Sequence, residues 1–312
     1  MTLVIGTHDG VYRVTDGFDT VERTLDATVH RVRRFDAGLF AAADTGLYRS
    51  PDGVEWAKVE SFAGEVVSTA VSPTGSHWYV GTKPAALYVS EDEGVTWNEV
   101  ESFQGLPSRE RWRDRAPGDD AGVRTIAIHQ GAPDRLVVGV EPGGVHSSVD
   151  RGRTWNERCD GVHDDVHHVL AQGVDEYVAS TGGGLYRTTD AGRTWLRQDT
   201  DFRDFWFTYF REAFHHDGTL YVAANGWGPA QPGGALLEWP DDEDVPNRVP
   251  YPGEKDSFVV SWAVDDGELY AGTMDVTDGF GQHEEARVLK RIDTGWMEVG
   301  RVPASARSMV SY

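Results

Sequence analysis

Five short segments of the chain carry a histidine or an arginine as their second residue, directly after an apolar residue. Imidazolium and guanidinium groups donate charge-assisted hydrogen bonds to carboxylates and phosphates. If the segments are equivalent strands, these groups would meet at one rim and bind a small anionic ligand. Alternatively, they pair with acidic neighbours (Asp164, Asp165, Glu212) and only line a wet channel. The candidate ligand-binding residues are His30, Arg124, His167, Arg211 and Arg307.

One segment, "HDDVHH" (163–168), brings three histidines close to two carboxylates. On a helix this spacing would suit a metal ion. On a strand, neighbouring side chains face opposite ways, so His167 and His168 do not easily reach one ion. The sequence assigns no metal site and no cofactor, and it leaves open whether His163, His167 and His168 bind a metal.

The elements that must position these residues are short strands in a repeated pattern. Seven copies of a two-strand template recur along the chain, and a further short strand precedes all but the first copy; the last such strand, 306–312, ends the chain. A repeat of about 40 residues with four strands is typical of a β-propeller. The sequence therefore predicts an all-β fold, a seven-bladed β-propeller in a single domain (1–312), with the C-terminal strand closing the first blade.

A second repeated feature is the pattern Ser/Thr-x-Asp-x-Gly-x-Thr-Trp, which we call the Asp-turn motif. It is complete at 90–97, 148–155 and 188–195, and shortened at 50–56. Each copy is expected between the third and fourth strands of a blade, where Asp and Ser/Thr bond turn amides, Gly takes a positive φ and Trp buries the turn. We expect a structural role, because the motif has no paired carboxylates for acid/base work.

The Asp-turn motifs resemble the Asp-boxes, or BNR repeats, of sialidases, sortilin-type receptors, photosystem II assembly factors and some endoglucanases. The stretch 105–195 is also similar to prokaryotic proteins called BNR-repeat glycosyl hydrolase-like. The resemblance implies the propeller fold, but the motif occurs on propellers with unrelated roles.

Through this resemblance, a sialidase-type glycosidase becomes the alternative function. It would use an arginine cluster, a Tyr–Glu nucleophile pair and an acidic general acid. The weak catalytic candidates are Glu141, Glu212 and Tyr209. The chain lacks the Arg-Ile-Pro segment that such enzymes carry near the N-terminus.

The charge balance limits the classes of partner that the protein is expected to bind. The chain holds 51 acidic residues against 29 lysines and arginines, for a formal net charge of −22, and lysine is rare. Such a surface suits a salt-adapted cytosol, where screening removes self-repulsion, and it argues against nucleic acid or an anionic membrane as partner. No apolar run approaches the length of a membrane helix. We expect a cytoplasmic, halophilic protein that is a monomer.

The predicted function is a binding scaffold for a small anionic ligand or a protein partner. The site is expected at the rim that carries the long loops 103–121, 200–208, 226–234 and 274–286, because elaborated loops on a rigid scaffold commonly carry function.

Overall fold

The computed structural model describes all residues except 113–119, 200–207, 227–232, 251–256 and 276–284. The chain is an all-β seven-bladed propeller, as the repeats predicted: seven sheets of four antiparallel strands each. The long loops named above lie partly or almost wholly outside the described residues. No helix in the described parts is long and apolar enough to cross a membrane.

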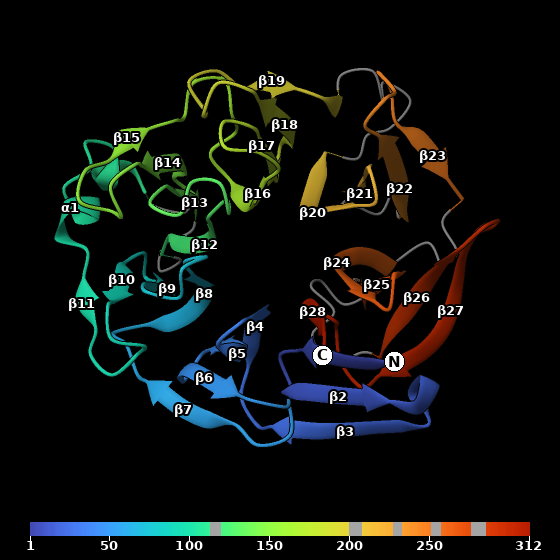
Figure 1. Ribbon diagram of the computed structural model, residues 1–312. Helices are drawn as coiled ribbons and strands as arrows, with labels where there is room; N and C mark the ends of the chain where they lie inside the picture. Colours follow the sequence, from blue (N-terminus) through green and yellow to red (C-terminus); the bar gives the residue numbers. More distant parts are fainter. Residues whose placement is uncertain (113–119, 200–207, 227–232, 251–256, 276–284) are drawn as a thin grey trace. The chain divides into compact units, whose positions relative to one another are not determined.

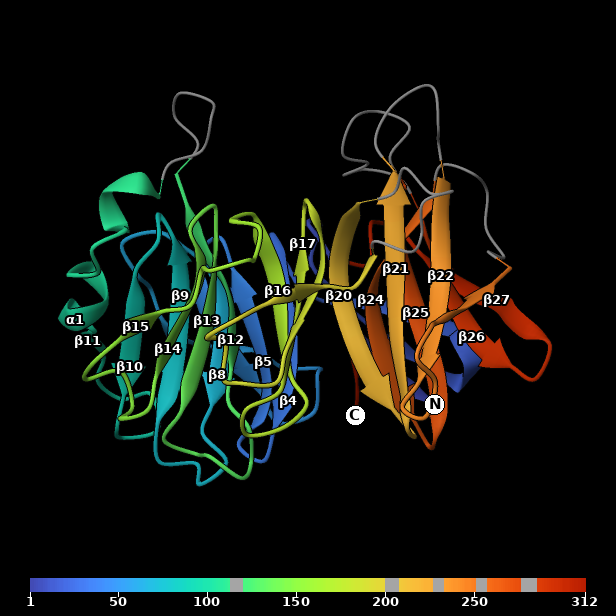
Figure 2. The same ribbon diagram turned by 90° about the horizontal axis from the view of Figure 1, so that it is seen from above.

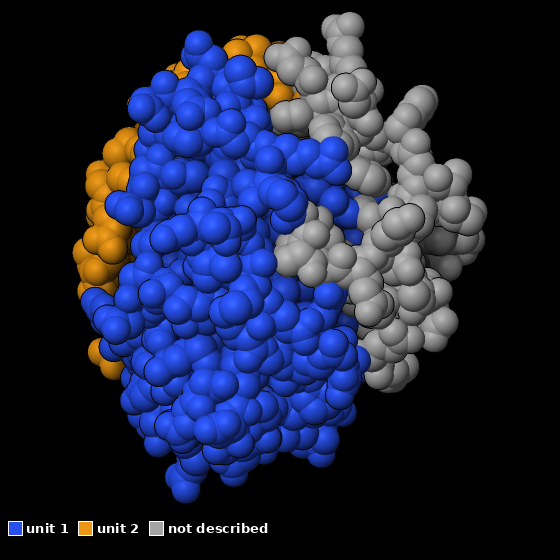
Figure 3. Space-filling view, turned by 90° about the vertical axis from the view of Figure 1, so that its right-hand side faces the viewer, with its two compact units in different colours: residues 1–58, 205–312 blue, residues 59–204 orange. Residues whose placement is uncertain are grey.

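The chain divides into two compact units, residues 1–58 with 205–312 (the first unit) and residues 59–204 (the second unit). In Figure 3 the two sequence segments of the first unit form one continuous surface. Its first two sheets are β28 (Ser308–Ser311), β1 (Thr2–Gly6), β2 (Val11–Thr15) and β3 (Thr20–Leu25); and β4 (Val29–Phe35), β5 (Gly38–Ala43), β6 (Gly46–Ser50) and β7 (Ala57–Glu60), which crosses the unit boundary after Lys58. The other two are β20 (Tyr209–His216), β21 (Thr219–Gly226), β22 (Gly233–Pro240) and β23 (Asn247–Val249); and β24 (Ser257–Asp265), β25 (Glu268–Asp275), β26 (Ala286–Ile292) and β27 (Gly295–Val302).

The second unit holds the other three blades and, among its described residues, two helical turns that the sequence did not predict: α1 (Glu101–Gln104) and the 3-10 turn Arg109–Arg111. In Figure 2 the strands of each blade run side by side, as in β12, β13 and β14. The sheets are β8 (Glu65–Val71), β9 (Trp78–Lys83), β10 (Leu87–Ser90) and β11 (Asn98–Glu99); β12 (Gly122–Ala127), β13 (Leu136–Glu141), β14 (Gly144–Ser148) and β15 (Asn156–Glu157); and β16 (Val166–Ala171), β17 (Tyr177–Thr181), β18 (Gly184–Thr188) and β19 (Leu196–Arg197).

The first blade is closed by the two ends of the chain. Strand β28 pairs antiparallel with β1, placing Val310 opposite Val4, and the Tyr312 amide donates to the Thr2 carbonyl over 3.1 Å. Pairing satisfies the backbone groups that an open edge would expose. The predicted closure by the C-terminal strand is confirmed.

The Asp-turn motifs lie between the third and fourth strands of their blades, as predicted. In the copy at 90–97, the Asp92 carboxylate accepts the Thr96 amide at 2.8 Å and its hydroxyl at 2.6 Å, while Ser90 Oγ accepts the Gly94 amide at 2.8 Å. The copies at 148–155 and 188–195 repeat these bonds. Bonds from the Thr194 amide and from the Thr188 and Thr194 hydroxyls lower the pKa of Asp190 to about 2. The motif carboxylates therefore stabilise the turns by accepting these hydrogen bonds.

The tryptophans of the motif differ in how they are buried. Trp195 is 5% exposed and donates from Nε1 to the Arg158 carbonyl over 2.8 Å. Trp97 and Trp155 are half-buried and donate to the glycine carbonyl of their own turn. Trp195 is the most deeply buried of the three, whereas Trp97 and Trp155 are the ones that bond to the turn of their own motif.

Candidate functional site

The first strand of six blades contains a β-bulge at the same place. A bulge inserts an unpaired residue and re-aims its side chain. Four of the five predicted ligand residues lie in these bulges, and Arg307 directly precedes the paired residues of β28. The bulged residues are His30, Val67, Arg124, His167, Arg211 with Glu212, and Val260. The structure thus gives the predicted residues a common backbone setting, two of them in the second unit (Arg124, His167) and three in the first.

The residue after the bulge links neighbouring blades where it is a serine or threonine. Ser308 Oγ donates to the Val32 carbonyl at 3.1 Å, and Ser261 Oγ donates to the Ala306 carbonyl at 2.6 Å. In the second unit Ser68 Oγ donates to the Val123 carbonyl, whereas Thr125 Oγ1 accepts the Val169 amide at 3.4 Å. Small hydroxyl side chains therefore join the first strands of adjacent blades.

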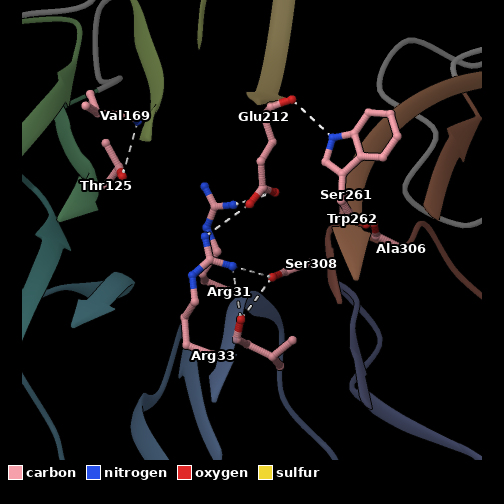
Figure 4. A network of polar contacts seen from close by, with 10 residues as sticks. Arg31, Arg33, Thr125, Val169, Glu212, Ser261, Trp262, Ala306 and Ser308 are labelled. Atoms are coloured by element: carbon pink, nitrogen blue, oxygen red, sulfur yellow. Dashed lines mark hydrogen bonds and ion pairs between the residues drawn. The ribbon is translucent and has the colours of Figure 1, made fainter. Parts of the chain in front are cut away.

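The first unit departs from this arrangement, because Arg31 takes the serine position in β4 and Glu212 lies within the bulge of β20. Arg31 Nη1 lies 3.0 Å from Glu212 Oε2, and Arg33 Nη2 lies 3.2 Å from Glu212 Oε1 (Figure 4). Arg31 and Arg33 are two residues apart on one strand, so they share a face. Both carboxylate oxygens of Glu212 are therefore bound by guanidinium groups.

This contact is well shielded from solvent. The side chains of Glu212 and Arg31 are 7% and 10% exposed, and that of Arg33 is 25% exposed. The Glu212 carbonyl also accepts the indole N–H of Trp262 at 3.2 Å, which ties β20 to β24 (Figure 4). A buried, doubly paired carboxylate holds its geometry firmly, and removing its charge would cost both guanidinium groups this ion pair.

We use the name arginine cluster for the Arg31–Arg33–Glu212 contact together with the cationic residues at equivalent positions of the first unit. Arg211 Nη1 donates to the Tyr209 hydroxyl at 3.1 Å. The members lie on, or directly before, the first strands of three blades: His30, Arg31, Arg33, Arg211, Glu212 and Arg307. Two of the four arginines, Arg31 and Arg33, pair with the Glu212 carboxylate, in a protein whose formal charge is −22. The sequence named Glu212 but missed Arg31 and Arg33.

The second unit gathers the remaining predicted residues into what we call the carboxylate–histidine cluster. Arg124 Nε forms an ion pair with Glu141 Oε2. His167 Nε2 lies 3.4 Å from Asp165 Oδ1 and 4.0 Å from Glu141 Oε1. The alternative in which the cationic residues face acidic neighbours therefore describes both Arg124 with Glu141 and His167 with Asp165. Asp164, by contrast, lies 3.7 Å from His163.

Comparison with known proteins supports the propeller fold. No protein-family model and no curated protein matches the sequence. Among solved structures, the chain is similar to the GH74 xyloglucanase from Xanthomonas campestris (14% identity, TM-score 0.68, 99% of this chain and 52% of that one). It is similar to the Niastella koreensis GH74 enzyme (17%, 0.63, 95% and 46%) and to the RRP9 WD40 repeats (14%, 0.62, 99% and 89%).

These comparisons bear on architecture. The chain spans about half the length of the two GH74 chains. A GH74 enzyme and a WD40 repeat protein match it about equally well, and one propeller serves many functions. The chain is a seven-bladed β-propeller that resembles hydrolase propellers among others, and any activity must be argued from its own residues.

Proposed function

We propose that this protein is an Asp-box propeller that binds a small carboxylate- or phosphate-bearing anion at the arginine cluster of the first unit. The observation that carries the proposal is the pairing of Arg31 and Arg33 with one buried carboxylate, Glu212. Arg211 directly precedes Glu212 on β20, and Arg307 directly precedes β28. Guanidinium groups bind planar carboxylates and phosphates through paired N–H donors. In a chain with so many acidic residues, this cluster of arginines indicates that the positive charge has a function.

The local geometry supports the same conclusion. Arg211 and Arg307 are half-buried, so a ligand could reach them while water screens the contact less than at an exposed site. Glu212 holds Arg31 and Arg33 in fixed positions on β4. An anion binding here would gain directional hydrogen bonds from groups that are already ordered.

The glycoside hydrolase alternative finds less support in the described residues. A general acid must carry a proton, whereas a neighbouring guanidinium favours the charged carboxylate. Glu212 faces two arginines and Glu141 faces Arg124. Turnover of aryl glycosides or sialosides by the purified protein, abolished by Glu141→Gln or Glu212→Gln, would establish the enzyme instead.

Isothermal titration with phosphate, citrate and sialic acid tests the proposal. Each guanidinium contact to an anion contributes about 1.5–3 kcal/mol, so Arg211→Ala or Arg307→Ala should weaken binding by roughly 10–100-fold. Arg34→Ala is the matched control, because Arg34 is exposed on the same strand as Arg31 and Arg33. Equal weakening by Arg34→Ala, or no binding of any of the three anions, would contradict the proposal.

A further inference from the structure

We propose a second site, independent of the arginine cluster: Glu141, Asp165 and His167 of the second unit bind a divalent transition-metal ion. Each residue offers one ligand atom, and the three atoms lie within 4.8 Å of one another. In a tetrahedral zinc site with bonds of about 2.0–2.1 Å, ligand atoms are about 3.3 Å apart. His167 Nε2 lies 3.4 Å from Asp165 Oδ1 and 4.0 Å from Glu141 Oε1, so the ligand atoms would move closer together on binding the ion.

The histidine is what distinguishes this group from an ordinary patch of surface carboxylates. The His167 side chain is 1% exposed, and its Nε2 atom faces the oxygens of both acids. The β-bulge between Val166 and His168 sets the position of His167. Burial keeps competing water away from the nitrogen, and neutral imidazole is a common ligand of zinc and other first-row metals.

Backbone packing also shapes the site around Asp165. A Cβ atom on Gly182 would lie 2.1 Å from Asp165 Oδ2, so only glycine leaves room for this carboxylate. The Gly182 amide donates to the Asp165 carbonyl at 2.9 Å, and the Asp165 amide donates to His163 Nδ1 at 3.2 Å. These contacts fix the position of the Asp165 carboxylate.

Arg124 supports the site without occupying it. Its Nε atom pairs with Oε2 of Glu141, whereas Oε1 is the oxygen nearer to His167. Carboxylates that bind metals commonly have their other oxygen hydrogen-bonded, which fixes their orientation. Two carboxylates and one arginine together carry a charge of −1, which favours a dication.

The ligand set selects the class of ion. One nitrogen and two oxygens suit Zn²⁺, Mn²⁺ or Co²⁺ better than Mg²⁺, which prefers all-oxygen octahedral sites with several waters. Three protein ligands leave at least one position for water or another small ligand. The His163/His167/His168 set considered from the sequence is therefore replaced by one histidine and two carboxylates.

The test is a titration of the chelator-treated full chain with Zn²⁺, in competition with a chromophoric chelator and in molar KCl to suppress loose binding to surface acids. Asp165→Asn and, separately, Glu141→Gln should each weaken zinc binding at least about tenfold. Co²⁺ provides a second readout, because its visible absorption should change in the wild type and not in the variants. Circular dichroism shows whether each variant is folded.

Asp164→Asn is the matched control. It removes the same charge from the neighbouring residue, whose side chain is 68% exposed and which is not among the three ligands. Zinc affinity should be unchanged in this variant. Zinc binding by the wild type no tighter than by Asp165→Asn, or equal weakening in Asp164→Asn, would overturn the proposal. Neither result would affect the arginine cluster, which lies in the other unit.

Discussion

The substitution Glu212→Gln removes the charge at the centre of the arginine cluster and keeps the size of the side chain. Breaking a buried ion pair by removing one partner costs about 3–5 kcal/mol. Glu212 is 7% exposed and binds two arginines, but Arg33 is 25% exposed and the glutamine oxygen still accepts one hydrogen bond. We therefore expect a loss near the lower end, about 3 kcal/mol, which corresponds to a fall in Tm of roughly 5–10 °C.

The same variant should respond more strongly to anions. Without the Glu212 carboxylate, Arg31 and Arg33 have lost the acid that both bind, and an added phosphate or citrate would supply negative charge in its place. Thermal unfolding with and without phosphate measures both effects. The rise in Tm on adding phosphate should be larger in Glu212→Gln than in the wild type, because ligand that binds the folded state stabilises it by mass action.

Glu298→Gln is the control for this experiment. Glu298 pairs with Arg301, whose side chain is 52% exposed, and its own side chain is 36% exposed; its second oxygen lies 4.0 Å from Arg287 Nη1. An exposed pair contributes about 0–1 kcal/mol. If Glu212→Gln costs no more than Glu298→Gln, or if phosphate stabilises the two variants equally, our account of the cluster is wrong.

Three further predictions concern stability. Trp195→Ala should destabilise the protein by about 3–5 kcal/mol in urea unfolding. The loss should be smaller for Trp155→Ala, because Trp195 is buried and Trp155 is half-buried. Equal losses in the two variants would contradict this prediction. Burial lowers the pKa of His146 from 6.5 to about 4, so the unfolded chain takes up the proton first. Stability should therefore fall by up to roughly 3 kcal/mol between pH 6.5 and 4, and His146→Gln should flatten that part of the pH profile; a parallel profile would refute it. Lowering KCl from molar to about 0.1 M should lower Tm as surface carboxylates lose their screening, and a constant Tm would exclude salt adaptation.

The fold was predictable because its signals are local and repeated. Alternating apolar residues located strands such as 29–35, which matches β4, and the extra strand at the C-terminus indicated closure of the first blade. Aspartate, glycine and tryptophan at fixed spacing located the turns. Each of these signals depends on residues that are close together in the sequence.

The clusters were only partly predictable because they depend on contacts between distant segments. Arg31 and Glu212 are 181 positions apart, and no local pattern pairs them. The bulges, which decide where His167 and Arg211 lie, insert one or two residues without a distinctive composition. One signal was available: Asp165 and His167 are only two residues apart in the sequence.

The position of a bound anion tests the central claim most directly. Crystals soaked in selenate, a phosphate-like anion with a strong anomalous signal, would show where the anion binds. We predict an anomalous peak within hydrogen-bonding distance of the guanidinium groups of Arg211 and Arg307, and no such peak in Arg211→Ala crystals. Selenate found only at other arginines, with none at the arginine cluster, would contradict the proposed function.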